Sequence, residues 1–329
     1  MLQQSKFHRT TRVDLASSAC ESNMQIAVAS SSSVGIPILK ELLAGSHTIA
    51  YVITNPDKST GRGQRILPND FAAYAEMNDL QIEKPESKAE LTSLVTSSPI
   101  DLVVTVAYGR IVPLQALDLP RYGWLNVHFS KLPRWRGASP VQYALLNQDK
   151  LAGISIFQLD EGMDTGPIYL AEEFPIQKDE TTSQLLERCA IKASTLLGKV
   201  LKSIEDGEIP SPQIEAGVTY APKFSKSDGH IKPSQAAQEI LAKVRALSEN
   251  PGVYILFRGE RLSINRATIS EYSNAPQTVG ALVATKHSLF LRVCDGVIEL
   301  NTVTPQGKKQ MSGADFARGA RIEIGELIE

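Results

Sequence analysis

The chain has 329 residues, a length that suits two domains better than one. Its hydrophobic fraction of 42% and charged fraction of 21% are typical of a soluble globular protein, and no apolar run approaches the roughly 18 residues that a membrane span needs. A net charge of -2 gives no sign of a nucleic-acid partner, so any such partner must be met by local basic patches.

The spacing of cysteines and histidines gives no metal-binding pattern. The five histidines lack metal-ligand spacing. Three cysteines lie too far apart for a metal cluster or a disulfide framework: Cys20, Cys189 and Cys294. We therefore predict no metal, and a reducing compartment such as the cytoplasm.

Residues 1–23 differ in composition from the rest of the chain. They are rich in Ser and Thr, lack the apolar core of a secretory signal and carry Lys6, Arg9 and Arg12. We predict a disordered extension or an alternative start, with the fold beginning at Met24. A transit peptide is the alternative, because such peptides are rich in Arg and Ser.

The first folded segment has the pattern of a βαβ unit. A strand at Met24–Ala29, a helix at Val34–Leu43 and a strand at Thr48–Thr54 predict parallel strands joined by a right-handed crossover. The turn at residues 30–35 holds four serines and lacks the Gly-x-Gly-x-x-Gly pattern, so a dinucleotide-dependent oxidoreductase has little support. Serines at a helix start remain compatible with a bound phosphate.

Asn55–Pro68 is predicted to be a loop from its composition. It carries Lys58, Arg62 and Arg65 against one acidic residue, Asp57. Loops with a few basic residues are common on protein surfaces. The alternative to an ordinary surface loop is a basic segment that contacts the phosphate groups of a nucleic acid.

The alternation of helices and strands then continues to a strongly apolar strand. The predicted elements are a helix, a short strand, a second helix and a central strand: Asp70–Asn78, Gln81–Glu83, Lys88–Thr96 and Asp101–Ala107. The central strand ends in Tyr108 and Gly109. Open α/β sheets bind ligands at the carboxyl ends of their strands, which makes these two residues candidates for a binding site.

The stretch from Trp124 to Gln142 contains the main candidates for chemistry. It begins with a β-prone segment, and residues two apart on a strand share a face, so Asn126 and His128 project side by side. A lone histidine at a strand end is more often a hydrogen-bonded structural residue. Together, however, an amide can hold a reacting carbonyl oxygen while an imidazole moves protons.

The rest of the first domain is predicted to contain loops, two strands and two helices. A loop rich in Pro, Gly and Arg, Ser130–Gly137, is followed by a helix at Ser139–Leu146. Two strands, Gly153–Leu159 and Ile168–Phe174, then flank a second loop at Asp160–Gly166. A long helix at Thr181–Asp206 ends the domain. Thr181 and Gln184 form the capping-box pattern that opens the long helix.

A Pro- and Gly-rich linker at residues 209–226 precedes a second domain at residues 227–329. That domain is predicted to have one helix, Gln235–Leu247, followed by short strands. The strands are Val253–Phe257, Glu260–Ala267, Ala281–Thr285, Ser288–Val293 and Val297–Val303. So many short strands predict a small barrel of the oligonucleotide-binding (OB) kind.

Several of these segments carry a family resemblance. Asn126-x-His128, Ser130–Gly137 and Leu159–Gly166 closely resemble the formyltransferases that use 10-formyltetrahydrofolate. The longer match is to the methionyl-tRNA formyltransferase family, through four further segments: Asn55–Gly63, Val106–Gly109, Thr219–Ser225 and Gly307–Ser312. The resemblance covers roughly residues 24 to 325.

The resemblance implies a fold and an activity. The fold is α/β, with a doubly wound, mostly parallel Rossmann-like sheet in a catalytic domain at residues 24–208 and a smaller C-terminal OB-like barrel. The activity is transfer of the formyl group of 10-formyltetrahydrofolate to the free amino group of initiator Met-tRNA, as used in translation initiation. The expected partners are this tRNA and the folate co-substrate, without a membrane, and a cytoplasmic monomer is expected.

The resemblance also assigns roles to residues. Asn126 is the oxyanion donor, His128 the general acid and base, and Asp164 the carboxylate that favours the imidazolium. The expected folate-binding residues are Ser130, Lys131, Leu132, Pro133, Tyr108, Gly109 and Asp160. The expected tRNA-binding residues are Lys58, Arg62, Arg65, Arg134 and Arg136. Two positions depart from the family pattern, because Lys131 replaces a usual Leu and Phe129 a usual Gly.

Two other functions share part of this pattern. A formyltransferase for a small amine, such as glycinamide ribonucleotide or a nucleotide sugar, would keep Asn126, His128 and Asp164. It would need neither the basic Asn55–Pro68 segment nor a barrel behind a linker. A catalytically inactive RNA-binding relative is the second alternative, and the intact catalytic residues argue against it.

Overall fold

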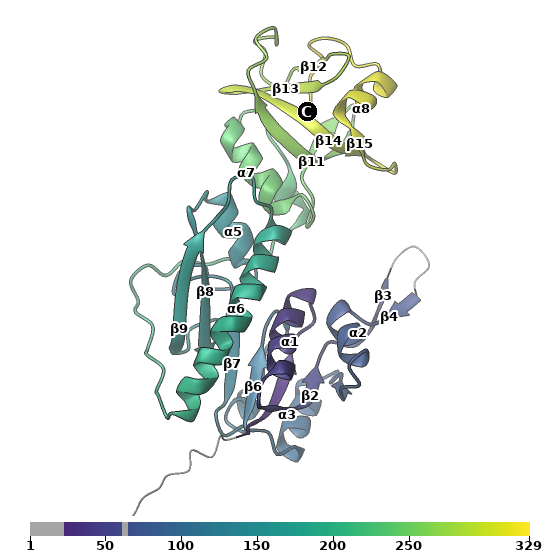
Figure 1. Cartoon of the computed structure of the whole chain (residues 1–329). Helices are drawn as coiled ribbons and strands as arrows, with labels where there is room; N and C mark the ends of the chain where they lie inside the picture. The colour runs from purple at the N-terminus through teal and green to yellow at the C-terminus, as the bar shows by residue number, and fades with distance from the viewer. Residues whose placement is uncertain (1–22, 61–64) are drawn as a thin grey trace, which may run out of the picture.

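The computed structural model describes residues 23–60 and 65–329. The chain forms a larger α/β unit and a smaller antiparallel unit, which meet where helices α5 and α7 lie side by side (Figure 1). Apart from Asn23, the predicted N-terminal extension lies outside the described residues. Among the described residues, no helix combines the length and the hydropathy of a bilayer-spanning segment.

The larger unit is built on a seven-stranded sheet with the order β5-β2-β1-β6-β7-β8-β9. Pairing is parallel from β5 to β7 and antiparallel from β7 to β9, which confirms the predicted mostly parallel sheet. The strands are β1 (Gln25–Ala29), β2 (Thr48–Ile53), β5 (Ile82–Glu83), β6 (Leu102–Thr105), β7 (Trp124–His128), β8 (Leu151–Gln158) and β9 (Ile168–Pro175). Chain order reverses between β1 and β6, the position where doubly wound sheets bind ligands.

Helices cover both faces of this sheet. The alternation of side chains along β1 shows the two layers, because Ile26 and Val28 belong to one hydrophobic cluster and Ala27 and Ala29 to another. The first cluster takes in α1 (Ile36–Ala44), α2 (Asp70–Glu76), α5 (Pro140–Leu146) and α6 (Thr182–Glu205). The second takes in α3 (Lys88–Ser97) and α4 (Leu114–Leu117). The predicted capping box of α6 is present between Thr181 and Gln184.

The prediction of a loop throughout Asn55–Pro68 was wrong. Two short strands, β3 (Lys58–Thr60) and β4 (Arg65–Leu67), pair antiparallel as a hairpin that projects from the larger unit (Figure 1). Three-residue strands leave little periodicity, and their charged residues and neighbouring glycines favoured a loop instead. Residues 61–64 lie outside the described part of the chain.

The smaller unit is an antiparallel sheet rolled into a half-barrel. Its path runs β10-β11-β14-β13-β12, with β15 paired to β14. The elements are α7 (Ala237–Leu247), β10 (Tyr254–Phe257), β11 (Glu260–Ser270), β12 (Leu282–Ala284), β13 (Leu289–Val293), β14 (Gly296–Pro305), β15 (Met311–Ser312) and α8 (Gly313–Ala320). The five predicted strands are present, and β15 and α8 were not predicted.

Candidate active site

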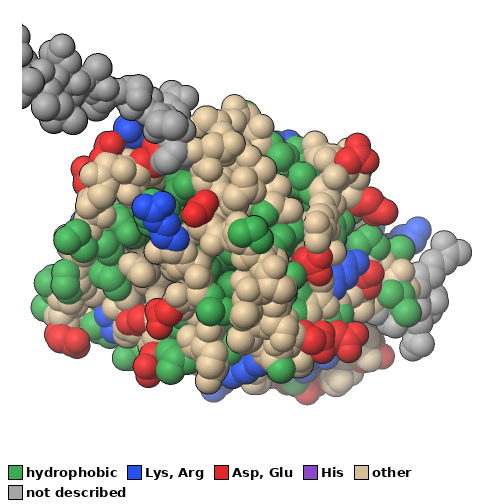
Figure 2. All heavy atoms as spheres, turned by 90° about the horizontal axis from the view of Figure 1, so that it is seen from below, with side chains coloured by type: hydrophobic (Ala, Val, Ile, Leu, Met, Phe, Trp, Pro, Cys, Tyr) green, Lys and Arg blue, Asp and Glu red, His purple; other side chains and the backbone are tan. Residues whose placement is uncertain are grey.

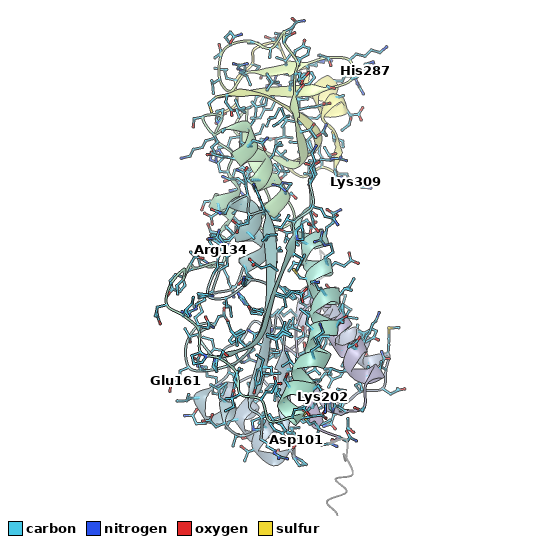
Figure 3. The ribbon with its side chains drawn as sticks, turned by 60° about the vertical axis from the view of Figure 1, so that its left-hand side comes forward. Asp101, Arg134, Glu161, Lys202, His287 and Lys309 are labelled. Atoms are coloured by element: carbon cyan, nitrogen blue, oxygen red, sulfur yellow. The ribbon has the colours of Figure 1, made fainter. Side chains whose placement is uncertain are left out.

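A cavity of about 640 Å³ opens beside the end of β7. Its walls come from the turn after β1, the segment after β6, the end of β7, the start of α5 and the loop after β8: Ser32, Ala107–Val112, Asn126–Phe129, Pro140–Gln142 and Leu159–Asp164. Figure 3 shows Arg134 and Glu161, from the segments after β7 and β8, on the same side of the larger unit. The cavity lies at the reversal of strand order and at the carboxyl ends of β1, β6 and β7, and the sequence predicted a site at such strand ends.

The His128 ring is held from two sides. Its Nε2 lies 3.0 Å from the carbonyl oxygen of Trp135, and its Nδ1 lies 3.6 Å from Oδ2 of Asp164. A carbonyl oxygen only accepts, so Nε2 carries a proton and Nδ1 of the neutral ring can take another. The same oxygen of Asp164 accepts the backbone N–H of Gly137 at 2.7 Å, which orients the carboxylate.

Asn126 lies on the same strand face and lines the same cavity. Within the described part of the chain its side-chain amide makes no hydrogen bond. The amide is therefore available to a substrate oxygen beside the imidazole of His128. The structure thus places all three predicted catalytic side chains around one cavity.

Two opposing effects set the pKa of His128. Burial lowers this pKa, because the ring is only 6% exposed and a charged imidazole loses hydration. The carboxylate of Asp164 and the carbonyl of Trp135 raise it, and burial outweighs them. The carboxylate of Asp164 favours the imidazolium, whereas burial favours the neutral imidazole, which is the form that can act as a base.

The backbone around the cavity is strained. Ala107, Trp135 and Asp164 have φ values of 47°, 62° and 54°, in the left-handed region that non-glycine residues rarely adopt. Such conformations cost about 1–3 kcal/mol each and persist where the surrounding structure imposes them. Each of these residues presents a group to the cavity or to His128.

The residues predicted to bind folate fall into two groups. Tyr108, Gly109 and Asp160 line the cavity of His128. The segment Ser130–Pro133 instead lines a second cavity of about 720 Å³, and Phe129 borders both. Both polar side chains of this segment are bonded within the protein: the Ser130 hydroxyl donates to the Arg134 carbonyl and the Lys131 ammonium to Glu173, each at 2.5 Å. A folate contact of this segment stays a prediction.

Comparison with known proteins decides the family. A family model described as "Formyl transferase" matches residues 24–201, and one described as "Formyl transferase, C-terminal domain" matches residues 223–321. The chain belongs to the formyl transferase family. The match spans both units of the structure.

Relatives with curated names cover nearly the whole chain. "Methionyl-tRNA formyltransferase" of Streptomyces griseus is 39% identical, over 93% of this chain and 99% of the relative. The protein of the same name from Cutibacterium acnes is 40% identical, over 93% of this chain and 100% of the relative.

Solved structures at lower identity share the fold. HypX from Aquifex aeolicus in complex with tetrahydrofolic acid has a TM-score of 0.64 at 16% identity and covers 90% of this chain and 47% of that one. "Methionyl-tRNA formyltransferase" from Clostridium thermocellum has a TM-score of 0.54 at 18% identity and covers 76% of this chain and 95% of that one.

In this formyl transferase the predicted tRNA-binding residues differ in exposure. Arg134 pairs with Asp149 at 2.7 Å and lies 4.4 Å above the Trp135 ring. Arg136 is 6% exposed and bonded to Gln213, so its charge does not reach the surface. The two on the hairpin are Lys58, which is exposed, and Arg65, of which only the backbone in β4 is described. Arg62 lies outside the described residues.

The sequence missed several groups at this site. Two are backbone groups, the Trp135 carbonyl and the Gly137 N–H. Nearly every residue type offers the same backbone groups, so the sequence does not single out their role. Gly137 does carry a signal, because its φ is 123° and an added Cβ would lie 2.8 Å from the Ala221 carbonyl oxygen. Lys223, which also lines the cavity, falls within the Thr219–Ser225 motif but was given no role.

Replacing Asp164 with Asn tests the effect of this carboxylate on His128. The carboxylate raises the pKa of His128 against the effect of burial. Its removal should therefore lower that pKa further and reduce turnover by at least about 100-fold. Titration of labelled histidine by NMR and the rate of formyl transfer check both effects. An unchanged His128 titration would exclude Asp164 from this role.

Proposed function

We propose that the protein transfers the formyl group of 10-formyltetrahydrofolate to the α-amino group of initiator Met-tRNA. The observation that carries the proposal is the convergence of Asn126, His128 and Asp164 on one cavity. The curated relatives support the acceptor, because their similarity spans both units. We expect the protein to act as a monomer in the cytoplasm, where the initiator tRNA is used.

The cavity has walls that suit the folate ring and side chains that suit proton transfer. Tyr108, Leu117, Leu159 and Met163 give apolar walls for a flat bicyclic ring, and nearby backbone groups can pair with its polar edge. Among the described residues, no group of three or more His, Cys, Asp or Glu side chains could hold a metal ion. We assign proton transfer and charge stabilisation to the side chains of Asn126, His128 and Asp164, which line this cavity.

The reaction is a direct acyl transfer. The amine nitrogen attacks the formyl carbon, and the carbonyl oxygen becomes an oxyanion to which Asn126 donates. His128 takes the proton of the attacking nitrogen at Nδ1 and becomes an imidazolium that Asp164 stabilises. As the bond to N10 of the folate breaks, His128 returns the proton to N10. No covalent enzyme intermediate is required.

The experiment that tests the proposal uses purified protein and three classes of acceptor. With 10-formyltetrahydrofolate, we expect formylation of Met-tRNA at rates far above those of glycinamide ribonucleotide or an amino sugar nucleotide. Formylation of a small amine without Met-tRNA would favour the small-amine alternative. Tight tRNA binding without any formyl transfer would favour the inactive RNA-binding relative.

The β3–β4 hairpin gives a prediction about tRNA binding. Charges of both signs are scattered over the face of the larger unit in Figure 2, which therefore lacks one dominant basic patch. Lys58 is an exposed cation on the projecting hairpin. Replacing Lys58 with Ala should raise the KM for Met-tRNA several-fold and reduce the log-log salt slope of binding by about one.

The matched control is Lys202→Ala, in the last turn of α6, which Figure 3 shows at the end of the larger unit away from the smaller one. It should leave the salt slope unchanged. In both variants the KM for folate should stay the same. An unaltered salt slope in the Lys58 variant would exclude this hairpin residue as a phosphate contact.

A further inference from the structure

The segment at residues 209–226 is hydrogen-bonded to β9 and to the loop that follows β7. Ser211 exchanges two backbone hydrogen bonds with β9, at 2.7 and 2.9 Å. The Arg136 N–H donates to the Thr219 carbonyl at 2.9 Å, and the Ala221 N–H donates to the Arg136 carbonyl at 2.7 Å. Of this connection between the two units, Lys223 lines the cavity of His128, whereas Ser211 and Gln213 line the second cavity.

Gln213 lies near the start of this segment, and its side-chain amide joins two loops. Its Oε1 accepts from the Arg136 guanidinium, at 2.6 Å from Nη2 and 3.2 Å from Nε. Its Nε2 donates to the backbone carbonyls of Asp164 and Gly166, each at 2.8 Å. A guanidinium only donates and a carbonyl only accepts, so these partners fix the orientation of the amide.

Each loop that Gln213 holds presents a group to His128. Arg136 lies between Trp135, whose carbonyl accepts from the imidazole, and Gly137, whose N–H orients the Asp164 carboxylate. The Nε2 group of the Gln213 amide donates to the backbone carbonyl of Asp164 itself. Trp135 and Asp164 both have positive φ values, which the surrounding contacts must maintain.

Arg136 keeps Gln213 in place. Its guanidinium is buried, and no carboxylate of the described residues lies within ion-pair distance of it. A buried guanidinium without a partner is costly, so the bonds to the Gln213 amide hold both side chains together. The side-chain hydrogen bonds of Gln213 go to Arg136, Asp164 and Gly166, and Gln213 lines the second cavity and not that of His128.

We propose that Gln213 is a positioning residue, which holds Asp164 and the Trp135 carbonyl in their places around His128. The inference rests on the proposed formyl-transfer chemistry. Because Gln213 acts through two loops and not on the substrates, its loss should lower kcat and leave KM nearly unchanged. We expect Gln213→Ala to lower kcat about 10- to 100-fold, as small misplacements of reacting groups do. KM for Met-tRNA and for folate should change by less than about threefold.

Gln213→Glu distinguishes the role of the accepting Oε1 from that of the donating Nε2 of the amide. The carboxylate still accepts from Arg136 but repels the carbonyls of Asp164 and Gly166, to which it cannot donate. Gln235→Ala is the matched control, because the Gln235 amide accepts a backbone N–H at 3.0 Å at the start of the smaller unit. The measurement is kcat for each variant, together with its thermal midpoint and the NMR titration of His128.

The groups that face the His128 ring are the Asp164 carboxylate, the Trp135 carbonyl and the Phe157 ring, whose centroid lies 6.3 Å away. If Asp164 moves off in Gln213→Ala, its charge supports the imidazolium less, and the pKa of His128 should fall. The control should keep the wild-type titration. If Gln213→Ala does not fold, kcat of Gln213→Glu provides the test, because the glutamate retains a partner for Arg136.

Two results would overturn the proposal. One is a wild-type kcat in both Gln213 variants. The other is a kcat that falls together with the thermal midpoint while the His128 titration stays that of the wild type, which would mark a merely structural role. Failure of the proposed function gives a different result from both, because the wild-type protein would then not formylate Met-tRNA. The titration of His128 in the Gln213 variants would still show whether Gln213 positions Asp164.

Discussion

Replacing His128 with Asn should lower the turnover of Met-tRNA formylation by at least about 100-fold, the scale of lost general acid–base catalysis. The neutral imidazole offers Nδ1 to the attacking amine, 3.6 Å from the Asp164 carboxylate that stabilises the resulting charge. The shorter asparagine keeps a polar group near the position of Nδ1, but it does not reach the Trp135 carbonyl that Nε2 contacts, and it cannot take up a proton at neutral pH. The substitution should therefore remove the proton carrier, and the thermal midpoint reports whether the fold is kept. Steady-state rates with saturating folate and Met-tRNA measure the effect.

His287→Asn is the control for this substitution. His287 is exposed on a turn of the smaller unit, and Figure 3 shows it at the end of the molecule far from the cavity. Its variant should keep wild-type turnover, and both variants should keep a thermal midpoint near that of the wild type. Turnover within a few-fold of the wild type in His128→Asn would refute the assignment of His128.

Asn126→Ala should raise the barrier for formyl transfer by about 3 kcal/mol, the usual loss on removal of an oxyanion donor. In kcat this is a loss of roughly 100- to 1000-fold. The amide lines the cavity on the same face of β7 as His128, so it can meet the oxygen on which charge develops. Its interaction strengthens in the transition state, and the affinity for folate should therefore barely change.

Single-turnover rates and a separate folate-binding titration distinguish these effects. Asn265→Ala provides the control, because the Asn265 amide oxygen accepts a hydrogen bond from Thr304 at 2.8 Å within the smaller unit. A large defect in folate binding with unchanged chemistry in Asn126→Ala would make Asn126 a residue of the folate pocket instead.

The local periodicity of the chain allowed much of the fold and the centre of the site to be predicted. Residues two apart on β7 share a face, and this spacing by itself places Asn126 beside His128. The βαβ opening and the long capped helix α6 were strong patterns and are present. The hairpin of β3 and β4, by contrast, is too short for a period to stand out from its polar composition.

The remaining features depend on contacts between segments distant in sequence. The buried state of Arg136 follows from its bond to Gln213, 77 residues away along the chain. The Ser130–Pro133 segment lines a different cavity from the catalytic residues, although it follows β7 directly in the sequence. The approach of Asp164 to His128 was inferred from the family motif, and residue identities alone do not show it.

The most direct test of the account is the pH dependence of single-turnover formyl transfer to Met-tRNA. Burial lowers the pKa of His128, so the rate should rise through an inflection below pH 6.5 as the imidazole becomes neutral. The ionisation of the attacking amine adds its own inflection. In His128→Asn the lower inflection should vanish while that of the amine remains. If His128→Asn keeps the wild-type profile with both inflections, His128 is not the proton carrier, and the account is contradicted.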